Sequence, residues 1–300
     1  MALAARTSST ASDERFRGEA RSLWGDAWRS LRRNPAAIAG AVTLAALVLA
    51  AAGAPLLAPF NPAAQDYNHL LEGASRQHLF GTDNLGRDIF SRVIFGARIS
   101  LSIGFFGTLF GLVVGVLVGL VSGFYGGFVD TVLMRFLDIQ LAFPGLLLAI
   151  AIVAVLGPGN LNVIIAIGIF SIPIYARLLR GSILAVKQFD FILAARATGA
   201  NDARLMRVHL LPNAVAPLFV VATLQLGTAI LTAASLSFLG LGVRPPSPEW
   251  GAMLSDGRGF LQIAPHVAVF PGLAIVVTVL ALNLLGDGLR DAIDPKLKKA

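Results

Sequence analysis

Five long stretches without a charged side chain constrain this chain more than any other feature of its sequence. They cover residues 34–65, 99–129, 139–176, 208–243 and 259–286. Each is long enough to supply a helix of about 20 residues, the length that crosses the hydrocarbon core of a bilayer. Charged residues make up only 14% of the chain, against roughly 25% in soluble domains. The solvent for most of this fold is therefore lipid.

The stretch from 139 to 176 is interrupted by the turn-forming sequence Gly157-Pro158-Gly159-Asn160 and divides into two helices. The sequence thus predicts six transmembrane helices. Only helices or closed barrels satisfy backbone groups in hydrocarbon, and the alternating pattern of barrel strands is absent. We expect an all-α, polytopic membrane protein with helices at roughly 36–58, 99–123, 128–156, 161–180, 214–240 and 267–286.

Lysine and arginine are distributed unevenly between the two sides of this arrangement. Eighteen of the 24 lie in the N-terminal segment, at the start of the third helix, after the fourth helix and in the C-terminal tail. The positive-inside rule therefore places both termini and residues 187–213 in the cytoplasm. The net charge of +7 has the same explanation, together with anionic lipid headgroups, and does not indicate nucleic acid.

Four regions follow from these predictions. Residues 1–34 form a cytoplasmic tail with an amphipathic helix, in which Phe16, Trp24 and Trp28 alternate with arginines. Residues 35–97 contain the first helix and an external connection. Residues 98–290 form the membrane core with a cytoplasmic loop at 187–213, and residues 291–300 form a second cytoplasmic tail.

The external connection contains the sequence "GTDNLGRDIFSRVIF". Thr82 or Asp83 can cap a short interfacial helix that leads into the second transmembrane helix. Asp83, Arg87 and Asp88 are expected to form a cluster of caps and salt bridges.

Within the membrane, small and ionisable residues predict helix packing. The second helix has a glycine at every fourth position, which places five of them on one face and allows a neighbouring backbone to approach closely. These are Gly107, Gly111, Gly115, Gly119 and Gly123. Near the cytoplasmic end of the third helix, Arg135 and Asp138 are three residues apart and are expected to pair structurally. Pro144 is expected to kink that helix.

Several kinds of chemistry are absent from the sequence. None of its four lysines follows a glycine, so no phosphate-binding loop is present, and we expect no ATP hydrolysis and no catalytic residue. The four histidines are scattered, without the spacing of a zinc site, so we expect no metal or other cofactor on this chain. No carboxylate lies at mid-membrane, where a proton- or sodium-driven carrier commonly has one. Any driving force must come from a partner.

The cytoplasmic loop has the pattern of a helix, a bend and a second helix. Residues 191–198 favour a short helix, Gly199 permits a left-handed conformation, and Asn201 or Asp202 can cap a second helix over 203–211, which Pro212 would stop. The apolar side chains of that second helix can pack on the membrane helices, whereas its arginines can meet another protein. The apolar residues are Leu205, Met206 and Leu210, and the arginines are Arg196, Arg204 and Arg207.

The sequence "LAARATGANDARLMRVHLLP" is similar to the cytoplasmic loop of bacterial ABC-importer permeases. Ala194-Ala195, Gly199 and Leu211-Pro212 have the spacing of that motif, and Leu193 replaces its acidic first residue. In such permeases the loop sits in a socket of the ATP-binding subunit. The resemblance therefore implies a coupling site made by Ala194, Ala195, Arg196, Gly199, Ala200, Asp202, Arg204, Leu211 and Pro212.

Other stretches across residues 22–298 resemble the second membrane subunit of the dipeptide, oligopeptide and nickel importers. Among them are "LFGTDNLGRDIFSRVIFGARISLSIGF" and "NLLGDGLRDAIDPKL". The resemblance implies a type I importer permease in the bacterial cytoplasmic membrane. Its partners would be a homologous permease, two ATP-binding subunits that hold ATP and Mg, and an external substrate-binding protein.

Two matters stay open at this point. The substrate implied by the resemblance is a di- or oligopeptide, with nickel complexes, glutathione and oligosaccharides as alternatives, and a secondary carrier or a membrane scaffold would be rival classes of function. The segment 247–263, which contains Trp250, could reach toward the binding protein, fold back into the mouth of the pathway, or form a solvated loop with an interfacial tryptophan.

Overall fold

The computed structural model describes residues 25 and 29–293, and its regular elements there are helices apart from one isolated β-bridge between Thr82 and Asp88. The amphipathic helix predicted within residues 1–34 lies largely outside the described residues. So does most of the predicted tail at 291–300.

Five described helices are long and apolar enough to cross a membrane, and a bent pair of helices passes the same test when its two members are taken together. Five of the six predicted spans are therefore present as single helices, and the bent pair occupies the position of the remaining one. The single helices are α3 (Pro35–Ala52), α5 (Ile89–Tyr125), α8 (Asn160–Val186), α12 (Ala216–Phe238) and α14 (His266–Ile293), and the bent pair is α6 (Gly127–Leu141) with α7 (Gly145–Leu156).

Shorter elements connect these spans. They are α4 (Ala54–Leu57), α9 (Asp190–Ala197), α10 (Asp202–Arg204), the π-helix η1 (Leu205–Leu210), α11 (Leu211–Ala214), α13 (Trp250–Gly257) and the 3₁₀-helix η2 (Arg258–Phe260).

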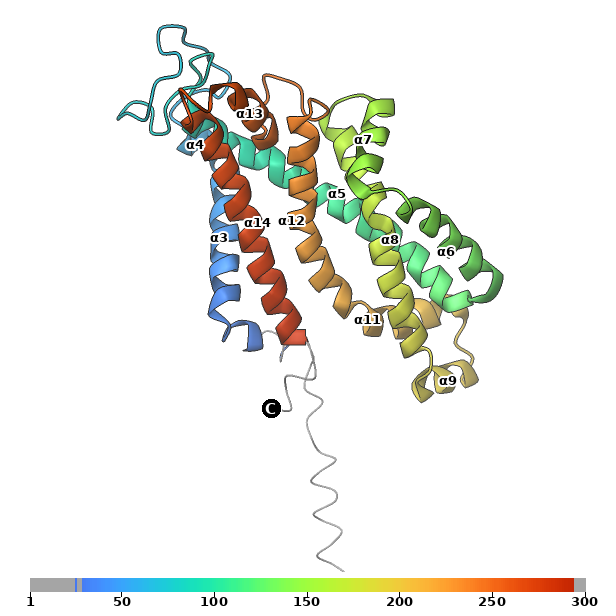
Figure 1. Cartoon of the computed structure of the whole chain (residues 1–300). Coiled ribbons are helices and arrows are strands. Elements are labelled where there is room, and N and C mark those ends of the chain that lie inside the picture. The colour runs from blue at the N-terminus through green and yellow to red at the C-terminus, as the bar shows by residue number, and fades with distance from the viewer. Residues whose placement is uncertain (1–24, 26–28, 294–300) are drawn as a thin grey trace, which may run out of the picture.

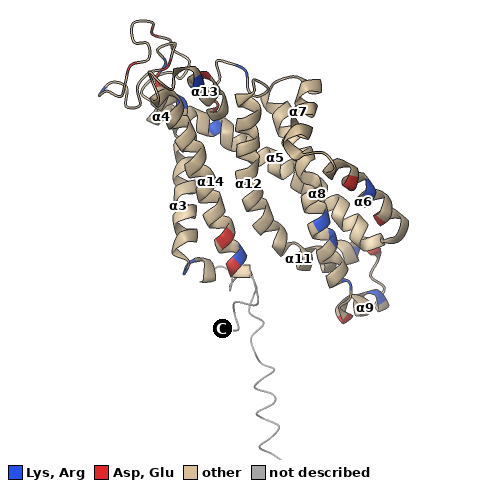
Figure 2. Ribbon diagram, in the orientation of Figure 1, with Lys and Arg blue, Asp and Glu red and all other residues tan. Residues whose placement is uncertain are grey.

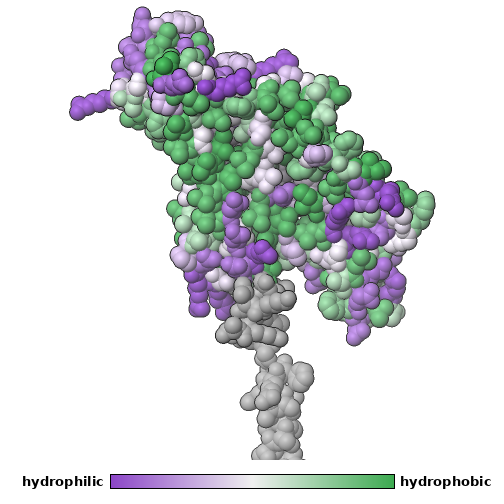
Figure 3. Space-filling view, viewed as in Figure 1, coloured by the Kyte–Doolittle hydropathy of each residue, from purple (hydrophilic) through white to green (hydrophobic). Residues whose placement is uncertain are grey.

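The long helices form a bundle with two distinct ends (Figure 1). The start of α3, the end of α14 and the helix α9 lie at one end, which we call the α9 end. The connection formed by residues 59–88 and the helix α13 lie at the other, which we call the loop end. Charged residues lie mainly at the two ends of the bundle and along α6 (Figure 2), and an apolar surface covers much of the visible face between the ends (Figure 3). This distribution suits a chain that spans a bilayer.

The five glycines of the second predicted helix bring α5 into backbone contact with α8 of the same chain. A Cβ atom on Gly119 would lie 2.5 Å from the carbonyl oxygen of Ala176, and one on Gly115 would lie 2.6 Å from Cβ of Tyr175. Gly107, Gly111 and Gly123 likewise face residues of α8. Glycine allows this approach where the lipid gives no hydrophobic drive for helices to associate.

The start of α5 differs from the prediction of a separate interfacial helix. Ile89, Phe90, Val93 and Ile94 lie in the first turns of α5 itself, which is continuous through 37 residues. Asp88, and not Thr82 or Asp83, caps it by accepting a hydrogen bond from the Ser91 N–H at 2.7 Å. The predicted boundary between residues 97 and 98 thus falls inside a helix.

The prediction of one kinked helix over 128–156 is also wrong. The chain forms α6 and α7, which meet at 90° across residues 142–144. Pro144 lies just before α7 and cannot donate a backbone hydrogen bond, so the break falls where the helical ladder would lose a bond. Side-chain bonding adds to the bend, because the Gln140 amide donates to the carbonyl of Ile169 in α8.

Ion pairs attach α6 to α8, but not through the predicted Arg135–Asp138 pair. Asp138 instead pairs with Arg177, and Asp130 pairs with Arg180 through two oxygens at 2.5 Å. Arg135 is exposed and contacts neither carboxylate. Charges near the membrane boundary are thus neutralised between helices that are distant in sequence.

A cluster of charged side chains, most of them buried, connects the segments of the loop end. The expected cluster is present: the Arg87 guanidinium donates to Asp83 at 2.6 Å and Asp88 caps α5, as described above. His78, which is buried, lies 2.9 Å from Asp88 through Nδ1. Arg87 also reaches Asp256 of α13 at 3.7 Å. Burial raises the pKa of Asp256, and the nearby Arg87 and Arg92 oppose that rise.

The segment around Trp250 is not a solvated loop. Trp250 is 1% exposed, and its indole N–H donates to the carbonyl of Val93 in α5 at 2.9 Å. Glu249, also 1% exposed, caps α13 by accepting the N–H groups of Gly251 and Ala252, and it accepts the hydroxyl of Ser100 at 3.2 Å. The segment therefore folds back against α5.

We expect Glu249→Ala to loosen α13. The change leaves the buried N–H of Gly251 and the partly buried N–H of Ala252 without an acceptor, and the loss of a buried acceptor costs about 1–3 kcal/mol. Trypsin cleavage after the exposed Arg258 should then be faster by about tenfold or more in reconstituted protein. The matched control is Glu72→Ala, because Glu72 is an exposed carboxylate at the same end. Equal cleavage rates for Glu249→Ala and the unmodified protein would contradict this role of Glu249.

Candidate coupling site

The segment between α8 and α12 forms a compact helical protrusion at the α9 end (Figure 1). The helix α9 is followed by Gly199 with φ of +86°, and the second helical part begins at α10. Asn201 caps that part by accepting a hydrogen bond from the Arg204 N–H at 2.9 Å. Because φ of +86° lies in the left-handed region, glycine is the residue best suited to this bend.

Contrary to the prediction, Pro212 does not stop the second helix. The chain continues from α10 through the π-helix η1 into α11, and Pro212 lies in the first turn of α11. The wide turn has a physical reason: proline has no N–H for the carbonyl four residues earlier, and its ring would crowd that carbonyl. A π-turn relieves the crowding, and such turns are frequent at functional sites.

The inner side of the protrusion shares one hydrophobic cluster with three transmembrane helices. Ile192 of α9 and Leu205 and Leu210 of η1 are buried against residues of α5, α8 and α12. The helix residues in this cluster include Leu120, Phe124, Tyr175, Leu179, Ile183 and Leu218. Since close-packed interiors transmit displacement with little compression, a movement of the protrusion would reach all three helices.

A lysine fixes the point where the protrusion leaves the membrane helices. The Lys187 ammonium donates to the carbonyl of Phe124, the penultimate residue of α5, at 2.5 Å and lies 5.6 Å from the Phe124 ring centroid. Lys187 is the C-cap residue of α8. The ends of α5 and α8 are thereby joined directly beside α9.

The outer side of the protrusion presents cationic and apolar side chains. Arg196, Arg204 and Arg207 are exposed, with no carboxylate paired to them among the described residues. Leu193, which replaces the motif's acidic residue, is 62% exposed, and the stacked rings of Phe189 and Phe191 precede it in the chain with centroids 6.0 Å apart. Large exposed apolar side chains that lie close together in the chain in this way are typical of an interaction site.

The structure brings the predicted coupling residues together within this one protrusion. Ala194, Arg196, Gly199, Asp202, Arg204 and Pro212 are exposed or partly exposed on its outside, whereas Ala195, Ala200 and Leu211 pack against the shared cluster. Sequence reasoning missed the aromatic pair, the tie through Lys187 and the π-helix. The spacing of Phe189 and Phe191, next to the motif, was a signal for the first of these.

No group of three His, Cys, Asp or Glu residues within the described ranges is placed to hold a metal ion. The protrusion offers cations, apolar side chains and a bent backbone. Such a surface can bind a protein and transmit its movement.

Comparison with known families gives two matches along the chain. Residues 111–299 match the family described as "Binding-protein-dependent transport system inner membrane component". Residues 22–74 match "N-terminal TM domain of oligopeptide transport permease C". The first of these covers more than half of the chain and includes the whole protrusion.

Curated relatives match over almost the full length. The "Glutathione transport system permease protein GsiD" of Shigella flexneri serotype 5b (strain 8401) is 55% identical over 93% of this chain and 93% of the relative. The protein of the same name from Escherichia coli O6:K15:H31 (strain 536 / UPEC) is 53% identical with the same coverage.

Solved structures show a similar fold at lower identity. A structure of inward-facing conformations of the MetNI methionine ABC transporter matches with a TM-score of 0.56 and 22% identity, over 69% of this chain and 98% of that one. A crystal structure of an amino acid ABC transporter with histidines matches with a TM-score of 0.52 and 16% identity, over 66% and 92%.

Proposed function

Because the chain belongs to the family of binding-protein-dependent transport system inner membrane components, as an ABC importer permease of the peptide and oligopeptide type, we propose that residues 187–213 couple it to an ATP-binding subunit. The chain is a multi-pass protein of a bacterial inner membrane. We further propose that both termini and the protrusion face the cytoplasm, in agreement with the distribution of lysine and arginine.

The shared hydrophobic cluster is the observation that carries the proposed mechanism. ATP-driven closure of two partner subunits would move the protrusion, and Leu205 and Leu210 would carry that movement to α5, α8 and α12. Binding energy that differs between two states of the partner then shifts the equilibrium between inward-open and outward-open forms. ATP and Mg would be held by the partner subunits and not by this chain.

The proposed assembly contains a homologous second permease, two ATP-binding subunits and an external binding protein. Membership in the family supports the kinds of partner. A self-sufficient secondary carrier fits poorly, because the spans lack the mid-membrane carboxylates that such carriers commonly use. The apolar patch at Leu193 further implies a partner socket with apolar walls.

We expect Arg204→Glu to weaken association with the ATP-binding subunits. Charge reversal on an exposed interface residue replaces attraction by repulsion, and we expect the amount of co-purified ATP-binding subunit to fall by about tenfold or more at low salt. The control is Arg76→Glu, the same reversal on an exposed residue of the loop end. Unchanged co-purification of the Arg204→Glu protein would remove Arg204 from the interface.

We propose glutathione, or a peptide of similar size, as the substrate. The relatives that match 93% of this chain carry the name of a glutathione transport system. The test is uptake of labelled glutathione, a dipeptide and a hexapeptide by cells that express this chain with its genomic neighbours and lack other peptide importers. ATP-dependent uptake of glutathione, with or without the dipeptide, supports the proposal, whereas uptake of the hexapeptide without glutathione overturns it.

A further inference from the structure

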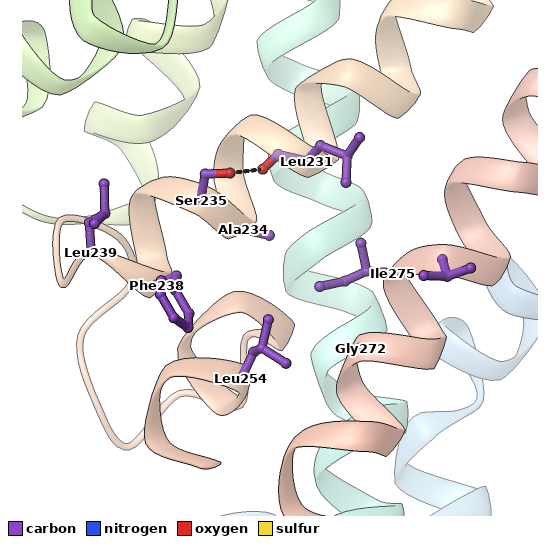
Figure 4. A pocket seen from close by; sticks show the side chains of 9 residues that line it. Leu231, Ala234, Ser235, Phe238, Leu239, Leu254, Gly272 and Ile275 are labelled. Atoms are coloured by element: carbon purple, nitrogen blue, oxygen red, sulfur yellow. Dashed lines mark hydrogen bonds between the residues drawn. The ribbon is translucent and has the colours of Figure 1, made fainter. Parts of the chain in front are cut away.

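An open groove of about 500 Å³ lies between α12, α13 and α14 near the loop end (Figure 4). Leu231 and Phe238 line it from α12, Leu254 from α13, and Ile275 and Val276 from α14. Ala234 and Gly272 add little bulk to its walls. The volume is within the roughly 300–1,000 Å³ of small-molecule sites.

The groove offers a ligand almost no hydrogen-bonding group. Ser235 is the one hydroxyl that lines it, and its Oγ donates to the carbonyl of Leu231 at 2.8 Å, as the dashed line in Figure 4 shows. A hydroxyl satisfied in this way does not demand a polar partner. The groove continues into the exposed apolar face of α14, where Val276 is 59% exposed. The part of a ligand that lies inside the groove must therefore be apolar.

A cation lies beside the wall of the groove that Phe238 forms. The Arg258 guanidinium carbon lies 5.3 Å from the centroid of the Phe238 ring, and that ring is part of the groove wall. Arg258 is exposed, and no carboxylate is paired with it in the described part of the chain. An unpaired guanidinium favours a phosphate, which it can bind through two parallel hydrogen bonds.

We propose that this groove binds a phospholipid of the bilayer, with one acyl chain between α12 and α14 and the phosphate at Arg258. A phospholipid joins apolar acyl chains to an anionic phosphate, and these two parts match the apolar groove and the guanidinium beside it. The assignment of this lipid to the outer leaflet depends on the orientation of the chain proposed above. The bound lipid would fill the space beside α13 and so support the contact of that helix with α12 and α14.

The test uses the complete importer with a photo-reactive amino acid in place of Val276, in nanodiscs of phosphatidylethanolamine and phosphatidylglycerol. Illumination should give an adduct with the mass of one phospholipid. Gly272→Leu should abolish the adduct, because it places a side chain in the groove: the Cβ at Gly272 meets only Leu254 Cδ1, at an ordinary contact distance of 3.6 Å. The matched control is Gly181→Leu, where a Cβ on α8 meets no atom within 4 Å.

The headgroup contact is tested by Arg258→Gln. One arginine near a membrane surface strengthens the binding of anionic lipid by about fivefold. We therefore expect the variant to need about fivefold more phosphatidylglycerol for the same adduct yield. A cross-link from position 276 to another protein subunit would overturn the proposal. So would a lipid adduct that survives Gly272→Leu, because it would come from the surrounding bilayer, and so would the absence of any adduct.

Discussion

Replacing Gly199 by valine is expected to lower ATP-driven uptake by about tenfold or more, while the protein still inserts and the partner subunits still hydrolyse ATP. Gly199 has φ of +86°, and a Cβ atom added to it would meet no heavy atom within 4 Å. Valine would therefore not clash with a neighbour. Its strain comes from the backbone, since a β-branched residue is a genuine outlier at positive φ.

That strain is relieved only if the bend changes. A negative φ at residue 199 would turn α10 and η1 away from α9 and separate Leu205 from the cluster that it shares with the membrane helices. The measurement is uptake and ATPase activity of the complete complex in proteoliposomes. Gly199→Asn is the control, because asparagine tolerates the left-handed conformation. Uptake at the unmodified level in Gly199→Val would show that the bend does not carry the coupling.

Gly119→Val is expected to destabilise the fold strongly. A Cβ atom at this position would lie 2.5 Å from the carbonyl oxygen of Ala176 and 3.1 Å from its Cα, so it would meet backbone atoms that cannot rotate away. The helices α5 and α8 would have to separate along the face that the other glycines hold together. Overpacking of this kind costs about 1–3 kcal/mol or more.

The measurement is the yield of monodisperse protein after extraction and the midpoint of its thermal unfolding, both of which should fall. Gly181→Val is the matched control, because it adds the same side chain to a membrane helix at a position with open space. A Gly119→Val protein with unchanged yield and unfolding midpoint would mean that α5 and α8 are not in backbone contact.

Both predictions concern positions that are marked in the sequence alone. Gly119 belongs to a regular series of glycines, and Gly199 interrupts a pair of short helices next to a recognisable motif. These signals are readable because a φ preference and a helical face are properties of a few neighbouring residues. The structure adds the atoms that each glycine faces: the backbone of Ala176 for one and open space for the other.

The predictions that are wrong depend on partners far away in the chain or on local backbone adjustment. Asp138 was expected to pair with Arg135 on its own helix, but it pairs with Arg177, 39 residues later. For Trp250 the sequence left several placements open, and the contact that decides between them is a hydrogen bond to Val93, 157 residues earlier. Pro212 was expected to stop a helix, and the π-helix before it accommodates the proline without ending the helix.

The sequence by itself determined that this chain crosses a membrane several times and carries a bent helical protrusion, because transfer into lipid and local backbone preferences act within about 20 residues. Only the tertiary structure decided which helices pair, how sharply α6 meets α7, and that α12, α13 and α14 leave a groove beside Arg258. Those features arise where side chains from distant segments meet. Their geometry is set by packing between helices, and the periodicity of the sequence along a single helix does not determine it.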